Sequence, residues 1–284
     1  KALPKDSAFP DIKNHPSLRY MVKGRRITGT YTYRDQENHI LGHVVRLEDA
    51  EGNKITSTLT YQKDSESTDG KTIQEGWKWK GFGDNRPLYG LEKLHHDETQ
   101  KDKPILLVEG EKTADKAQDL FPDHHVLTWS GGCGAVKKSD WSILKDKDIT
   151  IWPDHDKAGI NAANKIACIL KENHQTTPKI VDLDPTIPPK WDLADDKPKH
   201  LDIHKQVHEA REYDKEKALE QSKTHDLKGK KVLSEELIKK VTKNLGVKLN
   251  SGFEHKEIAL INTLYDSYRE LNPEMHKTDM IVKA

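Results

Sequence analysis

The stretch DITIWPDHDKAGINAANKIACIL, residues 148–170, predicts a short apolar strand that is followed almost at once by an amphipathic helix. Its second half repeats apolar residues at helical spacing, namely Ile160, Ala163, Ala167 and Leu170. Between the two elements stand Asp154 and Asp156, whose negative charges repel each other. Such a pair at the end of a strand predicts either a bound counter-charge or hydrogen-bond donors that stabilise the carboxylates.

The same alternation of strand and helix extends on both sides of this stretch. Short apolar runs end at Glu109, at Ser130 and at Asp184, and the run EKTADKAQDLF (111–121) has helical periodicity. A further short helix is expected near residues 137–144. Continuous apolar strands that alternate with helices are typical of a parallel sheet covered on both faces. We therefore predict an α/β fold for this part of the chain.

The residues before and after this region follow other patterns. Residues 27–62 contain three alternating or β-branched runs separated by polar turns, which predicts an antiparallel meander. Beyond residue 199 the chain is rich in Lys, Glu and His, with helices predicted from Ser234 and Ser251. The predicted organisation is a basic, mostly antiparallel β-rich subdomain (1–102), a parallel sheet flanked by helices (103–198) and a charged helical tail (199–284).

Composition narrows the function classes. Lys plus Arg and Asp plus Glu both number 47, so any basic surface must be local. No apolar stretch approaches the roughly 20 residues of a membrane-spanning helix, and we expect no membrane partner. The two cysteines, Cys133 and Cys168, are too few for a four-ligand zinc site or a disulfide framework, and they favour the reducing cytoplasm.

Acidic residues follow two of the predicted strands. Glu109 ends one apolar run, and Asp154 and Asp156 end another. Ligands of parallel α/β sheets gather at the carboxyl ends of the strands. Two carboxylates about 4 Å apart repel by roughly 4 kcal/mol at an effective dielectric of 20, and a divalent cation removes that cost. Oxygen ligands suit magnesium; the alternative is that the two aspartates cap the helix and form an Asx-turn.

The order of strand, Glu109, Gly110, helix, Gly-rich turn SGGCGA, strand, Asp154 and Asp156 resembles the toprim domain of primases, topoisomerases and certain nucleases. The resemblance implies a toprim parallel sheet. It assigns Glu109 the role of general acid or base. It assigns metal binding to the aspartate pair, so that Glu109, Asp154 and Asp156 together form the expected catalytic and metal site, with Mg²⁺ or Mn²⁺ as cofactor.

The likeness extends beyond this core, over roughly residues 27–196. Four successive segments resemble plasmid and phage primases, which are often fused to a helicase: residues 76–94, 106–115, 127–159 and 188–196. The implied activity is a DNA-dependent nucleotidyltransferase that makes short primers on single-stranded DNA from nucleoside triphosphates, with a replicative helicase as an allowed partner. Two alternatives stay open, a toprim nuclease or phosphodiesterase and a non-catalytic nucleic-acid-binding module. The sequence has no G-x-x-x-x-G-K-[ST] loop for a helicase motor.

Basic and aromatic residues are candidates for nucleic-acid contacts. Residues 13–34 contain no acid, and they combine basic residues, Arg25 and Arg26 among them, with Tyr20, Tyr31 and Tyr33. Charges for phosphates and rings for bases are typical of a single-strand groove, although a basic run is also typical of a solvated face. In the stretch GWKWK, Trp77 and Trp79 are predicted to be core residues. The further candidates for phosphate contacts are Lys78, Lys80 and Arg86.

Other residues of the predicted site have two interpretations each. Gly131, Gly132 and Gly134 permit either a phosphate-binding loop or a tight turn. Lys112 could contact a nucleotide phosphate or pair with Asp115 or Glu111. The stretch KWDLADD (190–196) could supply a further acid near the metal or cap a helix. Cys133 has no partnered histidine in the sequence, so a nucleophilic role is not expected.

Overall fold

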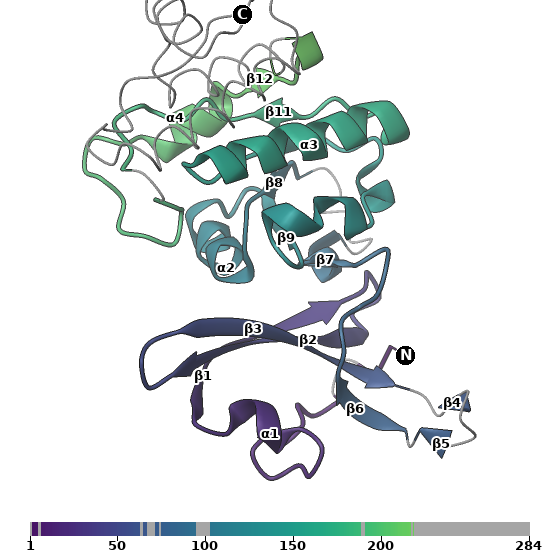
Figure 1. Cartoon of the computed structure of the whole chain (residues 1–284). Coiled ribbons are helices and arrows are strands. Elements are labelled where there is room, and N and C mark those ends of the chain that lie inside the picture. Colours follow the sequence, from purple (N-terminus) through teal and green to yellow (C-terminus); the bar gives the residue numbers. More distant parts are fainter. Residues whose placement is uncertain are drawn as a thin grey trace, which may run out of the picture. The chain divides into compact units, whose positions relative to one another are not determined.

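The computed structural model describes residues 2–4, 7–62, 65–66, 72–73, 75–94, 103–188, 191–216 and 218, with the backbone alone at 65–66 and 72–73. Contacts divide the chain into two compact units, Lys1–Asp214 and Lys215–Ala284. Almost all of the described residues belong to the first unit, which Figure 1 shows in colour. The helices predicted from Ser234 and Ser251 lie outside the described residues.

The predicted meander is present as an antiparallel sheet. Its strands are β1 (Arg25–Arg34), β2 (Ile40–Asp49), β3 (Lys54–Gln62) and β6 (Gly76–Trp79), in the order β1-β2-β3-β6. A separate two-stranded ribbon joins β4 (Ser65–Glu66) to β5 (Thr72–Ile73). The short helix α1 (Arg19–Val22) lies beside one face of the larger sheet. Trp77 and Trp79 pack there against Leu18, Val45 and Leu59, as predicted for core tryptophans.

The second sheet combines parallel and antiparallel strands. Its strands are β7 (Leu88–Tyr89), β8 (Ile105–Leu107), β9 (His125–Trp129), β10 (Ile149–Ile151), β11 (Lys179–Ile180) and β12 (Arg211–Glu212), in the order β12-β11-β10-β8-β9-β7. The four central strands are parallel, as predicted, whereas β7 and β12 pair antiparallel at the two edges. The chain is therefore a mixed α/β protein.

Helices connect the parallel strands. The α-helices of this part are α2 (Glu111–Leu120), α3 (Lys157–His174) and α4 (Ile203–His208), and short 3₁₀ helices are η1 (Leu91–Leu94), η2 (Cys133–Lys138) and η3 (Ser142–Leu144). In α3 the buried positions recur at helical spacing and include the predicted Ala163, Ala167 and Leu170. This agreement follows from burial, because a helix that covers a sheet must present an apolar stripe to it.

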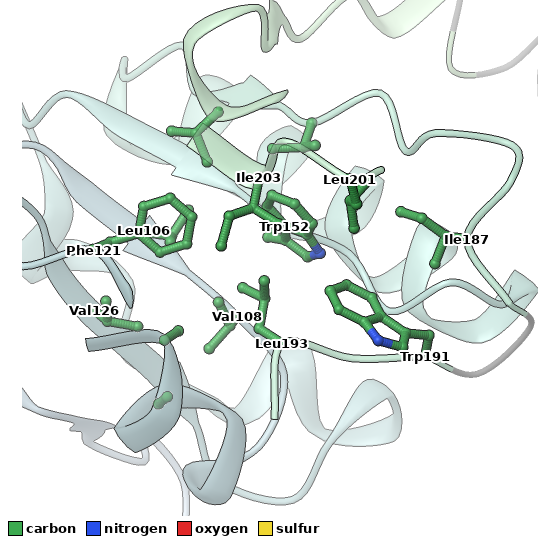
Figure 2. Packing of buried hydrophobic residues seen from close by; sticks show 14 residues of the cluster. Leu106, Val108, Phe121, Val126, Trp152, Ile187, Trp191, Leu193, Leu201 and Ile203 are labelled. Carbon is green, nitrogen blue, oxygen red and sulfur yellow. The ribbon is translucent and has the colours of Figure 1, made fainter. Parts of the chain in front are cut away.

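The core lies on both faces of the central strands. On one face, Leu106, Val108 and Trp152 pack with α2, with Phe121 and with the segment around Trp191 (Figure 2). On the alternate strand positions, Ile105, Leu107, Ile149 and Ile151 are equally buried, since each is 1% exposed or less. Burial on both faces explains why these strands appear in the sequence as uninterrupted apolar runs.

Three elements pack with the region between the predicted boundaries at 102/103 and 198/199, although they lie outside it in the sequence. Strand β7 comes from the predicted N-terminal subdomain, yet it pairs with β9 of the second sheet. Residues beyond 199 form α4 and β12, and Leu201, Ile203 and Val207 belong to the core cluster of Figure 2. Strands of two residues carry no measurable periodicity, so the sequence offers no signal for them.

No helix within the described ranges is both long enough and apolar enough to cross a lipid bilayer.

Candidate functional site

The predicted acidic residues emerge at one edge of the second sheet. Strands β8 and β10 are parallel neighbours, and Leu107 pairs with Ile151 at their carboxyl ends. Glu109 follows β8 by two residues, and Asp154 follows β10 by three. The register of these two strands therefore brings Glu109 and Asp154 to the same edge, where ligands of parallel sheets bind.

The carboxyl group of Asp154 has a raised pKa. Burial raises the pKa of Asp154 to about 7, and the negative charges of Glu109, Asp192, Asp156 and Asp195 act in the same direction. The groups that act on this carboxyl are thus other carboxylates. The sequence leaves the role of Asp192 and Asp195 open; they share a turn in which the amide of Ala194 donates to Asp192 Oδ1 at 2.6 Å.

Asp156 caps α3. Its side chain lies just before the helix and its Oδ1 accepts a hydrogen bond from the amide of Gly159 at 2.8 Å. The capping interpretation of this residue is therefore correct. A carboxylate has two oxygens and several lone pairs, so one capping bond leaves capacity for a cation.

The Gly-rich turn holds Glu109. The backbone amide of Cys133 donates to Glu109 Oε1 at 3.1 Å, and the Cys133 thiol lies 3.0 Å from both carboxylate oxygens. Burial raises the pKa of Cys133 to about 12, and the hydrogen bond and charge of Glu109 act in the same direction. The thiol is therefore protonated at neutral pH and donates to the glutamate. Gly131 and Gly132 have φ angles of 94° and 62°, as a tight turn requires.

This cluster fits a hard divalent cation by its chemistry. Its donors are half-buried carboxylate oxygens, and a cation would reduce the repulsion between their negative charges. Among the described residues, donor atoms of three potential ligands lie within 4.8 Å of one another only at Asp35, Glu37 and His39, in the turn after β1. The oxygens of Glu109, Asp154 and Asp156 do not all lie within this distance of one another.

The predicted phosphate-binding residues lie on several elements. Arg86 donates to the carbonyl oxygens of Gly83 and Ser130, both at 3.3 Å, so its guanidinium braces the Gly-rich turn. Lys112 is exposed on the first turn of α2, where it borders a shallow hollow with Lys93 and Lys116. Lys78 is half-buried in β6, and Lys80 is exposed directly after it.

Arg25 and Arg26 lie at the start of β1. Arg25 donates to the carbonyl of Met21 at 3.3 Å, and Arg26 pairs with Glu48 at 3.0 Å. Arg26 lies seven positions before Tyr33, which corresponds to about 23 Å of extended strand. The two arginines therefore lie far along β1 from the residue that bonds Glu111.

The tyrosines of the basic stretch differ in availability. Tyr20 is 61% exposed, whereas Tyr33 is completely buried. The hydroxyl of Tyr33 donates to Glu111 Oε1 at 2.6 Å, and the rings of Tyr31 and Tyr89 meet edge to face with centroids 6.1 Å apart. The expectation that Tyr33 is available to stack on a nucleic-acid base is therefore wrong. Its side of the strand faces the second sheet, a fact that the composition of the stretch does not reveal.

Comparison with known proteins returned one family model and several solved structures. The model, described as a domain of unknown function (DUF6371), matches residues 22–155. No curated protein matches the chain.

The solved structures that the chain resembles are primase domains. The primase fragment of the bacteriophage T7 primase-helicase protein is 21% identical, with a TM-score of 0.34 over 54% of this chain and 52% of that chain. The Aquifex aeolicus primase is 16% identical, with a TM-score of 0.43 over 69% and 46%. The E. coli primase catalytic core is 15% identical, with a TM-score of 0.37 over 75% and 66%. The chain spans about half the length of the T7 and Aquifex aeolicus structures.

Proposed function

We propose that this protein is a primase-like nucleotidyltransferase that synthesises short primers on single-stranded DNA, with Glu109, Asp154 and Asp156 as its metal-binding and catalytic residues. The observation that carries the proposal is the convergence of carboxylates at the carboxyl ends of β8 and β10. Structural ion pairs place opposite charges together, whereas the charges with the largest effect on Asp154 are all negative. An acidic cluster at this edge supports a site for cations and the phosphates that they bind.

The residues have distinct roles in this proposal. Glu109 acts as general base towards the primer hydroxyl, and its contacts with Cys133 hold the carboxylate in place. Asp154 and Asp156 are fixed by the end of β10 and by the cap of α3. When bound, Mg²⁺ or Mn²⁺ would orient the triphosphate and neutralise charge that develops on its phosphates.

The proposed partners are a single-stranded DNA template and nucleoside triphosphates, with a replicative helicase as a further partner. Lys112 lies three residues beyond Glu109 and is exposed, so it is our candidate for nucleotide phosphate. Lys78, Lys80, Arg86, Arg25 and Arg26 are the candidates for template phosphates. The guanidinium of Arg86 already donates to the carbonyl oxygens of Gly83 and Ser130, so only its remaining N–H groups can contact a phosphate.

The decisive experiment is primer synthesis from labelled triphosphates on mixed single-stranded templates with Mg²⁺ or Mn²⁺. We expect Glu109→Gln and the double variant Asp154→Asn with Asp156→Asn to lose synthesis while they keep the wild-type circular dichroism spectrum. Asp148→Asn is the matched control, because Asp148 precedes the same strand β10 at its opposite end and pairs with Lys179 at 3.1 Å. Synthesis at the wild-type rate by the double variant would overturn the proposal.

Two assays on the same purified protein distinguish the two alternative functions. Cleavage of labelled single-stranded DNA with Mg²⁺ but without triphosphates would indicate a nuclease, since water would then replace the primer hydroxyl. Binding that persists in EDTA and weakens with salt, without synthesis or cleavage, would indicate a non-catalytic nucleic-acid-binding module.

A further inference from the structure

A buried phenol joins the antiparallel sheet to the segment that follows Glu109. Tyr33 comes from β1 and is completely buried. Its hydroxyl donates to Glu111 Oε1 at 2.6 Å. Glu111 is the first residue of α2.

This contact lies close to Glu109 in the sequence. Glu111 follows Glu109 by two residues, so its bond to Tyr33 restrains the start of α2 directly after Glu109. The carboxylate of Glu109 is held separately by Cys133 of the Gly-rich turn. The hydroxyl of Tyr33 therefore restrains the segment that follows Glu109, while Cys133 restrains its side chain.

A glycine makes this segment dependent on such restraint. Gly110 separates Glu109 from Glu111 with a φ of 86°. Glycine has the greatest backbone freedom of any residue, so a segment that contains it needs outside contacts to keep one conformation. The amide of Gly110 has one such contact, a bond to Thr128 Oγ1 at 2.9 Å.

We infer that Tyr33 is a positioning residue, which orients Glu109 for cation binding through its hydrogen bond to Glu111. The inference rests on the proposed cation site, and it adds that the antiparallel sheet sets the geometry of that site. Groups that support the ligands of a metal without touching the metal affect its affinity by about 10- to 100-fold. For Tyr33, which acts one step further away, we expect about tenfold.

The experiment is isothermal titration calorimetry of Mn²⁺ and Mg²⁺ with the full chain, on the wild type and on Tyr33→Phe. The variant removes one hydroxyl and keeps the ring. Tyr89→Phe is the matched control, because the Tyr89 hydroxyl donates at 2.8 Å to Asp115, one turn further along the same helix. We expect Tyr33→Phe to weaken cation binding about tenfold, and Tyr89→Phe to bind as the wild type does.

A second pair of variants tests the same contact from the other side. Glu111→Gln and Glu111→Ala both remove the charge of Glu111, but only glutamine keeps an acceptor for Tyr33. We expect Glu111→Ala to bind the cation more weakly than Glu111→Gln, and Tyr33→Phe to add no further loss in the Glu111→Ala background.

The outcomes are distinct. Wild-type affinity in Tyr33→Phe, or equal losses in Tyr33→Phe and Tyr89→Phe, would overturn the role of Tyr33 while leaving the cation site intact. If the wild type binds neither Mn²⁺ nor Mg²⁺, the proposed function fails at its cation site, and the role inferred for Tyr33 fails with it.

Discussion

At Gly159, the absence of a side chain allows the first turn of α3 to pack directly against Asp154. A Cβ built at this position would lie 2.7 Å from the Asp154 carbonyl oxygen and 2.8 Å from its amide nitrogen. These are backbone atoms, which cannot rotate away as the end of a flexible side chain could. Glycine is therefore required at this position because the first turn of α3 approaches the backbone of Asp154 closely, and this contact fixes the helix relative to the carboxylate.

We therefore expect Gly159→Ala to lower the free energy of unfolding by about 1–3 kcal/mol, the usual cost of overpacking. Urea denaturation measures this change. The matched control is Gly134→Ala, because an added Cβ at Gly134 meets no atom within 4 Å. A surface change of that kind stays within about 0.5 kcal/mol. Equal stability of Gly159→Ala and the wild type would show that α3 can shift away from Asp154.

His43 makes stability depend on pH. The residue is 2% exposed on β2, its Nδ1 lies 3.0 Å from Thr32 Oγ1, and its Nε2 has no hydrogen-bond partner among the described residues. Burial lowers the pKa of His43 to about 4, and the charge of Arg34 contributes in the same direction. The unfolded chain, with a pKa of about 6.5 at this position, therefore takes up the proton first as pH falls.

The direction of the pH effect follows from this order of protonation. Above about pH 6.5 both states are neutral at His43, and stability does not depend on this group. Between about pH 6.5 and pH 4 only the unfolded state is protonated, so the free energy of unfolding decreases by at most about 3 kcal/mol. Urea denaturation as a function of pH measures this, and His43→Gln should reduce the dependence. If the free energy of unfolding of His43→Gln depends on pH as steeply as that of the wild type, other groups cause the effect.

At the scale of the element, the start of α3 combines a structural and a proposed chemical role in one residue. Asp156 caps the helix through the amide of Gly159. Asparagine caps as well as aspartate does, but it lacks the charge that a cation requires. The two roles can therefore be separated by substitution.

We expect Asp156→Ala to be less stable than Asp156→Asn by about 1 kcal/mol, the usual value of an N-cap. Both variants should lose cation affinity, because both remove the carboxylate. Thermal or urea unfolding measures the first quantity, and calorimetric titration with Mn²⁺ measures the second. If Asp156→Asn binds Mn²⁺ as tightly as the wild type, Asp156 is a capping residue alone.

Elements differ in how far the sequence predicts them. The strands of the meander, the central parallel strands and α3 agree with their predicted positions, because a long periodic or apolar run reports burial directly. Strands β7 and β12 have two residues each and were not predicted. Such short strands form where an edge strand still has unpaired N–H and C=O groups, and tertiary packing decides which edge strand they meet.

At the scale of the whole molecule, residues beyond the predicted boundary at 198 complete the core. Leu201, Ile203 and Val207 pack with Phe121 and Trp152 (Figure 2), and β12 pairs with β11. Burying each large apolar side chain contributes about 1.5–3 kcal/mol. This gross burial energy, before the entropic cost of ordering the segment, is comparable with the roughly 5–15 kcal/mol net stability that is typical of a whole domain.

We expect a chain that ends at residue 216 to unfold cooperatively in urea, and a chain that ends at residue 198 to lose most of its stability. Fluorescence of the tryptophans follows this unfolding, since Trp152 and Trp191 lie in the affected core. If the two truncated chains unfold at the same urea concentration, then the packing of residues 201–213 contributes little.

The amino-acid sequence alone predicts the order of the long elements and the edge at which Glu109 and Asp154 emerge. Apolar runs mark buried strands, and the residues after parallel strands lie at one edge of the sheet. Tertiary packing, in contrast, determines that Cys133 holds Glu109, that Asp192 and Asp195 act on Asp154, and that Tyr33 bonds Glu111. Periodicity records whether a residue is buried, but it carries no information on its partner. A hydrogen bond between residues 78 positions apart depends on how complete elements pack against one another.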